Sequence, residues 1–372
     1  MFILNIKSYS THRRCVLFHR ASVAANPRTM TKITILGAGV TGMTIASQLP
    51  KDCEITIVGQ HLPGDAPSKD WASPWAAAVW LGTHDTNEYE QKLQLDGLVG
   101  LRHLAERHPE SSVRKIRMRE IMDTGSPDQV WYQDKVPGFR WLSKSEMPEA
   151  SKYGMTYETV VITPPVFLPW MRDRLEQRGV QFKRVCVGSL KELEGLGHDI
   201  LINAAGLGVR TLADVKDSKV QPVRLQSAIF KHPTYREGYV RRGDGYYTTA
   251  FSHLDGEVYV GGVIEPGSDD VNAYDDKRQM ILDRAHDNQP DVFPSTDLKK
   301  AGFVRDHASW YPARFRKDGG VRVEAETVGG QKVIHAYGQH AGGYTFSYGI
   351  AWEVERIVQS TVADSRSLQA RL

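Results

Sequence analysis

An apolar run that leads directly into three spaced glycines, at residues 32–42 (KITILGAGVTG), sets the start of the fold. The run predicts a buried parallel strand, and the residues after it predict an amphipathic helix. Gly37 would turn the chain, Gly39 would let the backbone approach a pyrophosphate, and Gly42 would let helix and strand pack closely. The helix N-terminus would offer free N–H groups to the phosphates. A second apolar run at residues 54–58 lies at βαβ distance, so we predict a dinucleotide site rather than the glycine-rich turn of an ordinary α/β domain.

Length, charge and cysteine content narrow the class of protein. The 372 residues are enough for two domains. A net charge of +3 does not favour binding to nucleic acid, and no apolar run approaches the roughly 20 residues that span a bilayer. The three cysteines form no C-x-x-C pair and no spacing typical of metal ligands. We therefore expect no metal and no disulfide scaffold, in a reducing compartment.

The remaining pattern predicts two kinds of domain. Strands alternate with helices near both ends of the chain, whereas residues 221–262 show strands and turns, with Asp255-Gly256 suited to a hairpin turn. The expected helices are 88–106, 164–179, 276–285 and 343–362, and the expected strands are 113–122, 129–136, 159–162, 180–187, 199–203 and 332–336.

These elements predict an α/β protein with a discontinuous Rossmann-like nucleotide-binding domain and a second, mixed and mainly antiparallel β domain for the substrate. The first domain would comprise residues 31–85, 160–215 and 305–372, and the second residues 86–159 and 216–304. Residues 1–30 form a basic N-terminal extension.

Three further segments resemble one family of flavoenzymes: residues 72–76 (ASPWA), 203–208 (NAAGLG) and 335–344 (HAYGQHAGGY). Their order and approximate spacing are similar to those of the D-amino-acid oxidase family, which includes D-aspartate oxidase. The resemblance runs from about residue 31 to residue 358. It implies that the dinucleotide is FAD, bound in extended form with its flavin between the two domains. The alternative is an unrelated Rossmann dehydrogenase that uses NAD.

The resemblance also implies which residues hold the cofactor. The first glycine turn would bind the pyrophosphate, Val187 would touch the adenine side, and the C-terminal glycine turn would face the flavin, with the next helix N-terminus aimed at its electron-rich edge. Gln60 stands where dinucleotide sites commonly have Asp or Glu for a ribose hydroxyl, which weakens NAD more than FAD. The implied cofactor residues are Gly37, Ala38, Gly39, Val40, Thr41, Gly42, Gln60, Ser68, Ala72, Ser73, Val187, Gly206, Ala341, Gly342, Gly343, Tyr344 and Thr345.

In this family an amine gives a hydride from its α-carbon to the flavin, and O2 reoxidises the flavin with release of H2O2. The resemblance therefore implies a D-amino acid or a related amine as substrate and three candidate catalytic residues, Tyr247, Tyr311 and Arg314. Tyr247 matches a substrate-binding tyrosine of the family, and Arg314 matches a second, usually structural, arginine. Tyr311 stands where relatives carry the arginine that clamps the substrate carboxylate, and a neutral phenol cannot make that bidentate pair.

The substrate end thus departs from the family pattern, because Ile264 also stands at or next to a position where relatives have a tyrosine. Arg305 or Arg316 could replace the lost clamp, although both also suit a solvated surface. Two alternatives to a typical D-amino-acid oxidase stay open. The chain could oxidise a cyclic or carboxyl-modified amine, or it could bind flavin without turnover.

Both ends of the chain carry possible addresses. The basic N-terminal extension lacks Asp and Glu and is similar to a mitochondrial transit peptide, but synthesis from Met30 is the favoured interpretation. The last three residues, Ala370-Arg371-Leu372, are similar to a peroxisomal address, which an import receptor would read. We expect a peroxisomal protein, otherwise a cytoplasmic one. A homodimer is also expected, because it is the commonest oligomer of soluble proteins.

Overall fold

The computed structural model describes residues 30–369. The extension at residues 1–29 and the terminal Ala370-Arg371-Leu372 lie outside the described residues, so both targeting predictions stay predictions.

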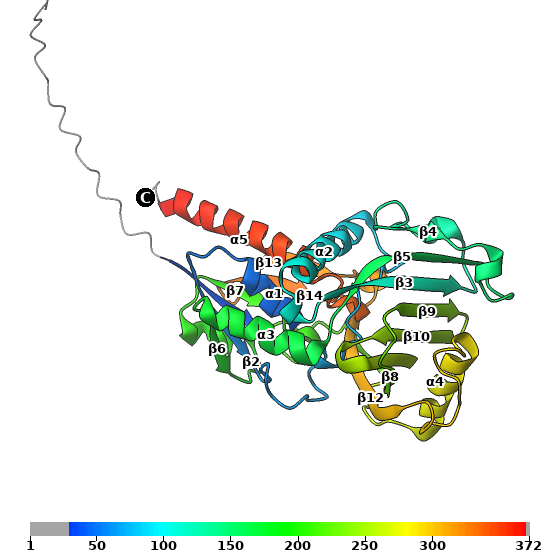
Figure 1. The fold of residues 1–372 in the computed structure, drawn as a ribbon. Coiled ribbons are helices and arrows are strands. Elements are labelled where there is room, and N and C mark those ends of the chain that lie inside the picture. The colour runs from blue at the N-terminus through cyan, green and yellow to red at the C-terminus, as the bar shows by residue number, and fades with distance from the viewer. Residues whose placement is uncertain (1–29, 370–372) are drawn as a thin grey trace, which may run out of the picture. The chain divides into compact units, whose positions relative to one another are not determined.

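A six-stranded sheet contains the first strand of the sequence (Figure 1). Its order is β13-β14-β7-β1-β2-β6, and every pair is parallel except β13 with β14 at one edge. Ile35, Leu36, Ile57 and Val58 point alternately to the two faces and are almost fully buried, as expected for parallel strands covered on both faces. The strands are β1 (Thr31–Leu36), β2 (Cys53–Gly59), β6 (Gln181–Arg184), β7 (Ile200–Asn203), β13 (Arg322–Val328) and β14 (Gln331–Tyr337). The expected Rossmann-like sheet is confirmed.

Four helices pack on or beside this sheet. They are α1 (Val40–Gln48), α2 (Glu88–Arg107), α3 (Pro164–Gln177) and α5 (Ser347–Gln369). Helix α5 contacts α1 and strands β13 and β14, while α2 lies between α5 and the second sheet. The start of α2 is a capping box, in which the Asn87 side chain accepts from the Glu90 N–H and the Glu90 carboxylate accepts from the Asn87 N–H. No helix of residues 30–369 combines the length and the apolar character needed to cross a membrane.

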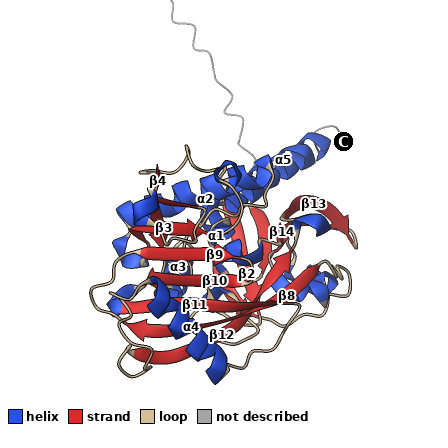
Figure 2. Cartoon of the chain, turned by 90° about the vertical axis from the view of Figure 1, so that its right-hand side faces the viewer, coloured by secondary structure: helices blue, strands red, loops and turns tan. Residues whose placement is uncertain are grey.

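The second sheet has eight strands in the order β12-β8-β11-β10-β9-β3-β5-β4 (Figure 2). All pairs are antiparallel except β3 with β9, so the expectation of a mixed, mainly antiparallel sheet is confirmed. Asp255 and Gly256 have φ of +56° and +70° in the turn between β10 and β11, as the Asp-Gly pair predicts. The strands are β3 (Arg114–Met122), β4 (Arg140–Trp141), β5 (Tyr153–Val161), β8 (Val220–Lys231), β9 (Gly238–Gly243), β10 (Tyr246–Ser252), β11 (Glu257–Pro266) and β12 (Phe303–Arg314), and α4 (Asp275–Asn288) packs on β8, β10 and β11.

Two expected elements differ from the structure. The strand expected at residues 129–136 is wrong: this segment forms local turns, such as the Val130 N–H bond to the Pro127 carbonyl. Its apolar pattern reflects burial rather than strand pairing, because Val130 and Tyr132 are both fully buried. The last helix begins at Ser347 rather than at Gly343, because the preceding residues form a tight turn closed by the Phe346 N–H bond to the Gly342 carbonyl.

The strands also show where each segment of the chain lies. Strand β12 pairs with β8 from Phe303 to Arg314, so the residues after 305 continue the eight-stranded sheet, although the sequence assigned them to the nucleotide domain. The reason is that β12 is a single long strand which the expected boundary cuts near its start. The division into two domains is otherwise a prediction that the structure leaves open.

Candidate active site

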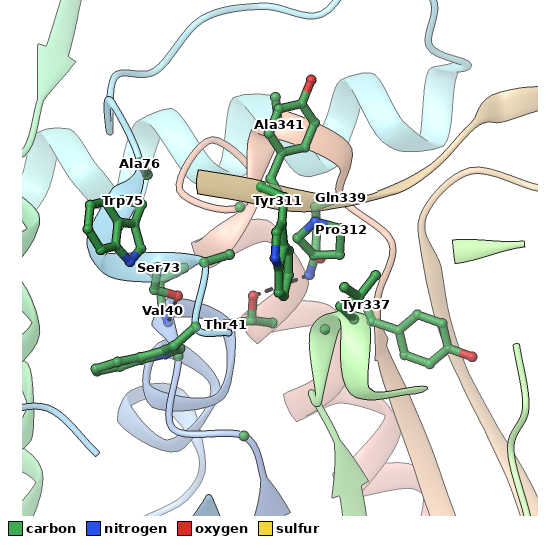
Figure 3. Close-up of a pocket in the computed structure, with 18 of the residues that line it drawn as sticks. Val40, Thr41, Ser73, Trp75, Ala76, Tyr311, Pro312, Tyr337, Gln339 and Ala341 are labelled. Atoms are coloured by element: carbon green, nitrogen blue, oxygen red, sulfur yellow. Dashed lines mark hydrogen bonds between the residues drawn. The ribbon is translucent and has the colours of Figure 1, made fainter. Parts of the chain in front are cut away.

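A cavity of about 660 Å³ is lined by residues of both sheets (Figure 3). At one end it is lined by the first glycine turn and by the ends of β2 and β7. At the other end it is lined by side chains of the eight-stranded sheet. The segment at residues 71–79 and the C-terminal glycine turn lie along its length.

The first glycine turn forms the nucleotide end of the cavity. Gly37 has φ +115°, and its N–H donates to the Val58 carbonyl at 2.8 Å. A Cβ on Gly37 would lie 2.3 Å from the Ala204 carbonyl oxygen, so only glycine fits this turn. The Val40 N–H at the start of α1 donates to the Ser73 hydroxyl at 3.0 Å, which ties the turn to the segment beside it (Figure 3).

This end of the cavity fits a diphosphate. Among residues 30–369, no acceptor binds the backbone N–H groups of Gly39 and Thr41, and both residues line the cavity. The first turn of α1 also contains no acidic side chain that could compete for those donors. Free N–H groups at the positive end of a helix dipole are the donor set that phosphate oxygens require.

The C-terminal glycine turn reaches the same place. The Gln339 side chain donates to the Thr41 hydroxyl at 3.3 Å, which joins the two turns directly (Figure 3). The Tyr344 hydroxyl donates to the Ser73 carbonyl at 3.1 Å, and the Thr345 hydroxyl donates to the Val79 carbonyl at 3.4 Å. Residues 73–79 are therefore attached by hydrogen bonds to both glycine turns.

The predicted cofactor residues fall into two groups in the structure. Gly42 and Ser68 do not line the cavity. A Cβ on Gly42 would lie 2.0 Å from the Gly37 carbonyl oxygen, so Gly42 permits close packing of α1 on the turn, and Ser68 accepts from the Trp75 indole N–H at 2.8 Å. The predicted residues that do line the cavity are Gly37, Ala38, Gly39, Val40, Thr41, Gln60, Ala72, Ser73, Val187, Gly206, Ala341, Gly342, Gly343, Tyr344 and Thr345.

The other end of the cavity is a wall of side chains from five strands. These are Tyr311 on β12, Leu225 on β8, Ile264 on β11, Tyr247 and Phe251 on β10, and Arg242 on β9. Burial raises the pKa of both the Tyr247 and the Tyr311 phenols. Both phenols therefore stay protonated at neutral pH, where they are hydrogen-bond donors and not bases.

Three predicted substrate-end arginines lie elsewhere. Arg314 does not line the cavity; its guanidinium lies 3.3 Å from the Asp217 carboxylate and donates to the Gly320 carbonyl at 2.8 Å. These contacts hold Arg314 within the fold and away from the cavity, so its position does not support a catalytic role, and that assignment stays a prediction. Arg305 makes a bidentate pair with Glu257 at 2.7 and 2.8 Å, and Arg316 lies near Asp85 at the surface, so neither replaces the clamp.

The sequence reasoning missed Arg242 and His340, which both line the cavity. A signal for Arg242 existed in the hairpin pattern. Residues 238–243 precede the strand of Tyr247 across a short turn, and the register pairs Arg242 with Tyr247, so the two side chains share a face. His340 has φ +54°, and a non-glycine residue in that conformation could not be read from the sequence.

This fold and this cavity define a class of protein. Two glycine turns at the parallel sheet and a wall of side chains from the second sheet line one cavity. This is the architecture of a dinucleotide-dependent enzyme that binds its substrate on a separate face. The comparison with protein families gives the member of that class: the family model described as "FAD dependent oxidoreductase" matches residues 32–357, and the chain belongs to this family. The cofactor is therefore FAD, and the NAD alternative is excluded.

Similar proteins support the same assignment. The chain is 27% identical to a D-amino-acid oxidase of Fusarium vanettenii over 90% of its length and 98% of that protein. It is 28% identical to a D-aspartate oxidase of Talaromyces thermophilus, over 89% of this chain and 95% of the relative. The fold is similar to that of glycine oxidase from Geobacillus kaustophilus, with a TM-score of 0.69, 17% identity, and coverage of 89% of this chain and 95% of the other. The resemblance seen in the sequence is confirmed.

Proposed function

We propose that the protein is an FAD-dependent oxidase of a D-amino acid or a related amine, with O2 as the electron acceptor and H2O2 as a product. The observation that carries this proposal is one cavity with a nucleotide end built from glycine turns and a substrate wall that contains Tyr247 and Tyr311. The names of the similar proteins, a D-amino-acid oxidase and a D-aspartate oxidase, support the same substrate class.

The proposed reaction is a two-electron oxidation of the amine. The amine carbon loses a hydride and the nitrogen loses a proton, so a C=N bond forms in place of the C–H bond. The bound FAD supplies the two-electron acceptor for this oxidation. In the net reaction O2 takes up two electrons and two protons to give H2O2, and water hydrolyses the imine to a keto product and ammonia.

The residues of the chain contribute positioning rather than proton transfer. Leu225, Phe251 and Ile264 make the wall apolar, which disfavours water next to a bound amine carbon. Tyr247 and Tyr311 line the same space, where a protonated phenol can donate to a substrate oxygen. Such a reaction is accelerated mainly by holding the C–H bond of the amine in one orientation.

An anaerobic titration tests the proposal. Purified holoenzyme is mixed without O2 with a panel of D-amino acids and of cyclic and N-substituted amines, and the visible flavin absorbance is followed. We expect bleaching by at least one of these amines, then return of the colour and formation of H2O2 when air is admitted. A yellow protein that no amine bleaches would instead be a flavin-binding protein without turnover.

We also propose a peroxisomal location, because a peroxide-forming oxidase suits that compartment and the chain ends in Ala370-Arg371-Leu372. Imaging of a fusion with a fluorescent protein placed before Thr31 tests this. We expect punctate peroxisomal signal that becomes cytosolic when two extra residues follow Leu372. Unchanged peroxisomal signal would show that the tripeptide is not the address.

A further inference from the structure

Arg242 is the single lysine or arginine that lines the cavity in residues 30–369. The only acidic residue in that lining is Asp70, which is exposed. The amine end of the cavity therefore carries one permanent positive charge. It stands on β9, directly across the strand pair from Tyr247, with the guanidinium carbon 5.9 Å from the centre of the Tyr247 ring.

The guanidinium of Arg242 keeps its donors unused within the described part of the chain. No hydrogen bond or ion pair joins it to another residue of that part, and its Nε is buried without an acceptor. The neighbouring Arg241 behaves differently. Its Nε lies 3.0 Å from the Asp123 carboxylate, and its side chain also donates to Asn288 at 3.0 Å. Adjacent strand residues point to opposite faces, so one arginine stabilises the fold while the other faces the cavity.

A buried carboxylate on the neighbouring strand β3, that of Glu120, attracts the Arg242 guanidinium. Glu120 is fully buried, and one of its oxygens accepts from the Tyr132 hydroxyl at 2.8 Å and the Tyr157 hydroxyl at 2.5 Å. Burial by itself would lower the pKa of Arg242, but the attraction of Glu120 acts together with that of the neighbouring tyrosines, and the net effect raises the pKa. Within residues 30–369 no ion pair or hydrogen bond joins the two side chains, so the donors of Arg242 stay available to a ligand.

We propose that Arg242 binds the anionic group of the substrate, a carboxylate, and so determines which amines the protein oxidises. This inference rests on the proposed function, because it concerns the orientation of the amine in that cavity. A guanidinium offers two parallel N–H donors, which match the two oxygens of a carboxylate and which the Tyr311 phenol cannot replace.

The position of Arg242 has a consequence for how the substrate lies. Strands β8, β11 and β10 separate β12, which carries Tyr311, from β9, which carries Arg242. Neighbouring strands are about 4.8 Å apart, so the two backbone positions lie several strand widths apart along the wall. The carboxylate would lie on the side of Tyr247 that is away from Tyr311, and the rest of the substrate would extend toward Tyr311.

Isothermal titration calorimetry on the oxidised holoenzyme tests this assignment. The probes are cyclohexanecarboxylate and its neutral amide, which have nearly the same shape and differ in charge. The variants are Arg242→Gln, Arg242→Lys and the double variant Arg242→Gln/Glu120→Gln, which also removes the opposing buried charge. Arg241→Gln is the matched control, because it removes the adjacent arginine on the opposite face of the same strand. Flavin absorbance and the Tm of each variant are measured in parallel.

We expect the wild-type protein to bind the carboxylate at least about tenfold more tightly than the amide, the size of a charge-assisted bidentate contact. Arg242→Gln and the double variant should abolish this preference while binding of the amide stays the same, and Arg242→Lys should restore part of it. Arg241→Gln should keep the preference. A side chain that only supports the fold would change Tm without changing the ratio of the two affinities.

Equal affinity of the wild-type protein for the two probes, or no binding of the carboxylate, would overturn the proposal without any variant. A preference that survives in the folded, yellow double variant would also overturn it. Failure of the proposed function gives a different result, because no amine would then bleach the flavin. Bleaching by an amine together with acid binding independent of residue 242 would reject only the present inference.

Discussion

The two ends of the cavity are built in different ways. The nucleotide end uses backbone N–H groups and residues with little or no side chain, such as Gly37, Gly39 and Gly206. The amine end uses large side chains from five strands, among them Tyr247, Tyr311 and Arg242. A backbone surface tolerates few residue types, because a single Cβ closes it, whereas a side-chain wall can be rebuilt one residue at a time without changing the sheet beneath it.

The segment at residues 73–79 connects these two ends. The Tyr344 hydroxyl holds it from the C-terminal glycine turn. From the eight-stranded sheet, the His253 ring donates to the Ala77 carbonyl at 2.9 Å, and the His307 ring donates to the Trp75 carbonyl at 2.7 Å. The cofactor side of the cavity therefore depends on side chains of the substrate sheet, and four experiments probe how far the two ends are independent.

The largest effect on cofactor binding is expected from Gly37→Ala, which alters only the nucleotide end. The new Cβ would lie 2.3 Å from the Ala204 carbonyl oxygen, at a φ that costs an alanine about 1–2 kcal/mol before any clash. With the clash we expect a loss of about 3 kcal/mol in FAD binding, or about 100-fold in affinity. The ratio of flavin absorbance to protein measures it. Gly195→Ala is the control, since its Cβ meets nothing within 4 Å and its φ is not positive, and equal loss in both variants would reject the explanation.

The largest effect of a single substitution on stability is expected from Arg314→Leu, which tests whether this residue belongs to the amine end. The change leaves the Asp217 carboxylate buried without its ion pair, which costs about 3–5 kcal/mol of unfolding free energy. Urea denaturation measures this loss. The double variant Arg314→Leu/Asp217→Leu should recover much of it, because no charge is then left unpaired. Weaker carboxylate binding in a variant of unchanged stability would place Arg314 at the substrate.

Acidification should weaken the connection between the two ends. Burial lowers the pKa of His253 to about 4, and that of His307 to about 4 as well. The unfolded chain binds these protons near pH 6.5, so the native state holds fewer protons, and stability is fully present above pH 6.5 and declines toward pH 4. Each histidine should contribute a slope of up to about 1.4 kcal/mol per pH unit in that window. Urea denaturation at several pH values from 7.5 to 4.5 measures this slope. The variant His253→Gln keeps a donor for the Ala77 carbonyl but removes the titrating group, so the slope should become flatter. An unchanged slope in this variant would contradict the explanation.

The smallest effect is expected from Tyr311→Phe. The Tyr311 hydroxyl makes no hydrogen bond to another residue of the described chain, so its removal should leave Tm unchanged. A lost contact to a substrate oxygen would cost about 0.5–1.5 kcal/mol, which is about a 3- to 10-fold rise in KM with little change in kcat. Steady-state kinetics with the best amine of the panel measure this. A loss of kcat by several orders of magnitude would show that the phenol takes part in the reaction.

Sequence reasoning succeeded where the contacts are local. The strand, glycine turn and helix of residues 31–48 lie within one continuous segment, and the loop Asp255-Gly256 lies within one hairpin, so their residue types report their backbone conformation directly. The expected strand at residues 129–136 shows the limit. Val130 and Tyr132 are apolar because they enter the core, and nothing in the local pattern distinguishes that from strand pairing.

The sequence by itself determined that the chain binds a dinucleotide, because the glycines that such a turn needs lie close together in one segment and have no substitute. The tertiary structure alone decided which charged side chain meets the substrate. From the sequence alone, four arginines are equally good candidates for binding the substrate: Arg242, Arg305, Arg314 and Arg316. In the structure the last three form ion pairs with other residues of the protein. Only the pairing of β9 with β10 places the remaining one in the cavity, because strand register settles which face of a sheet each side chain occupies.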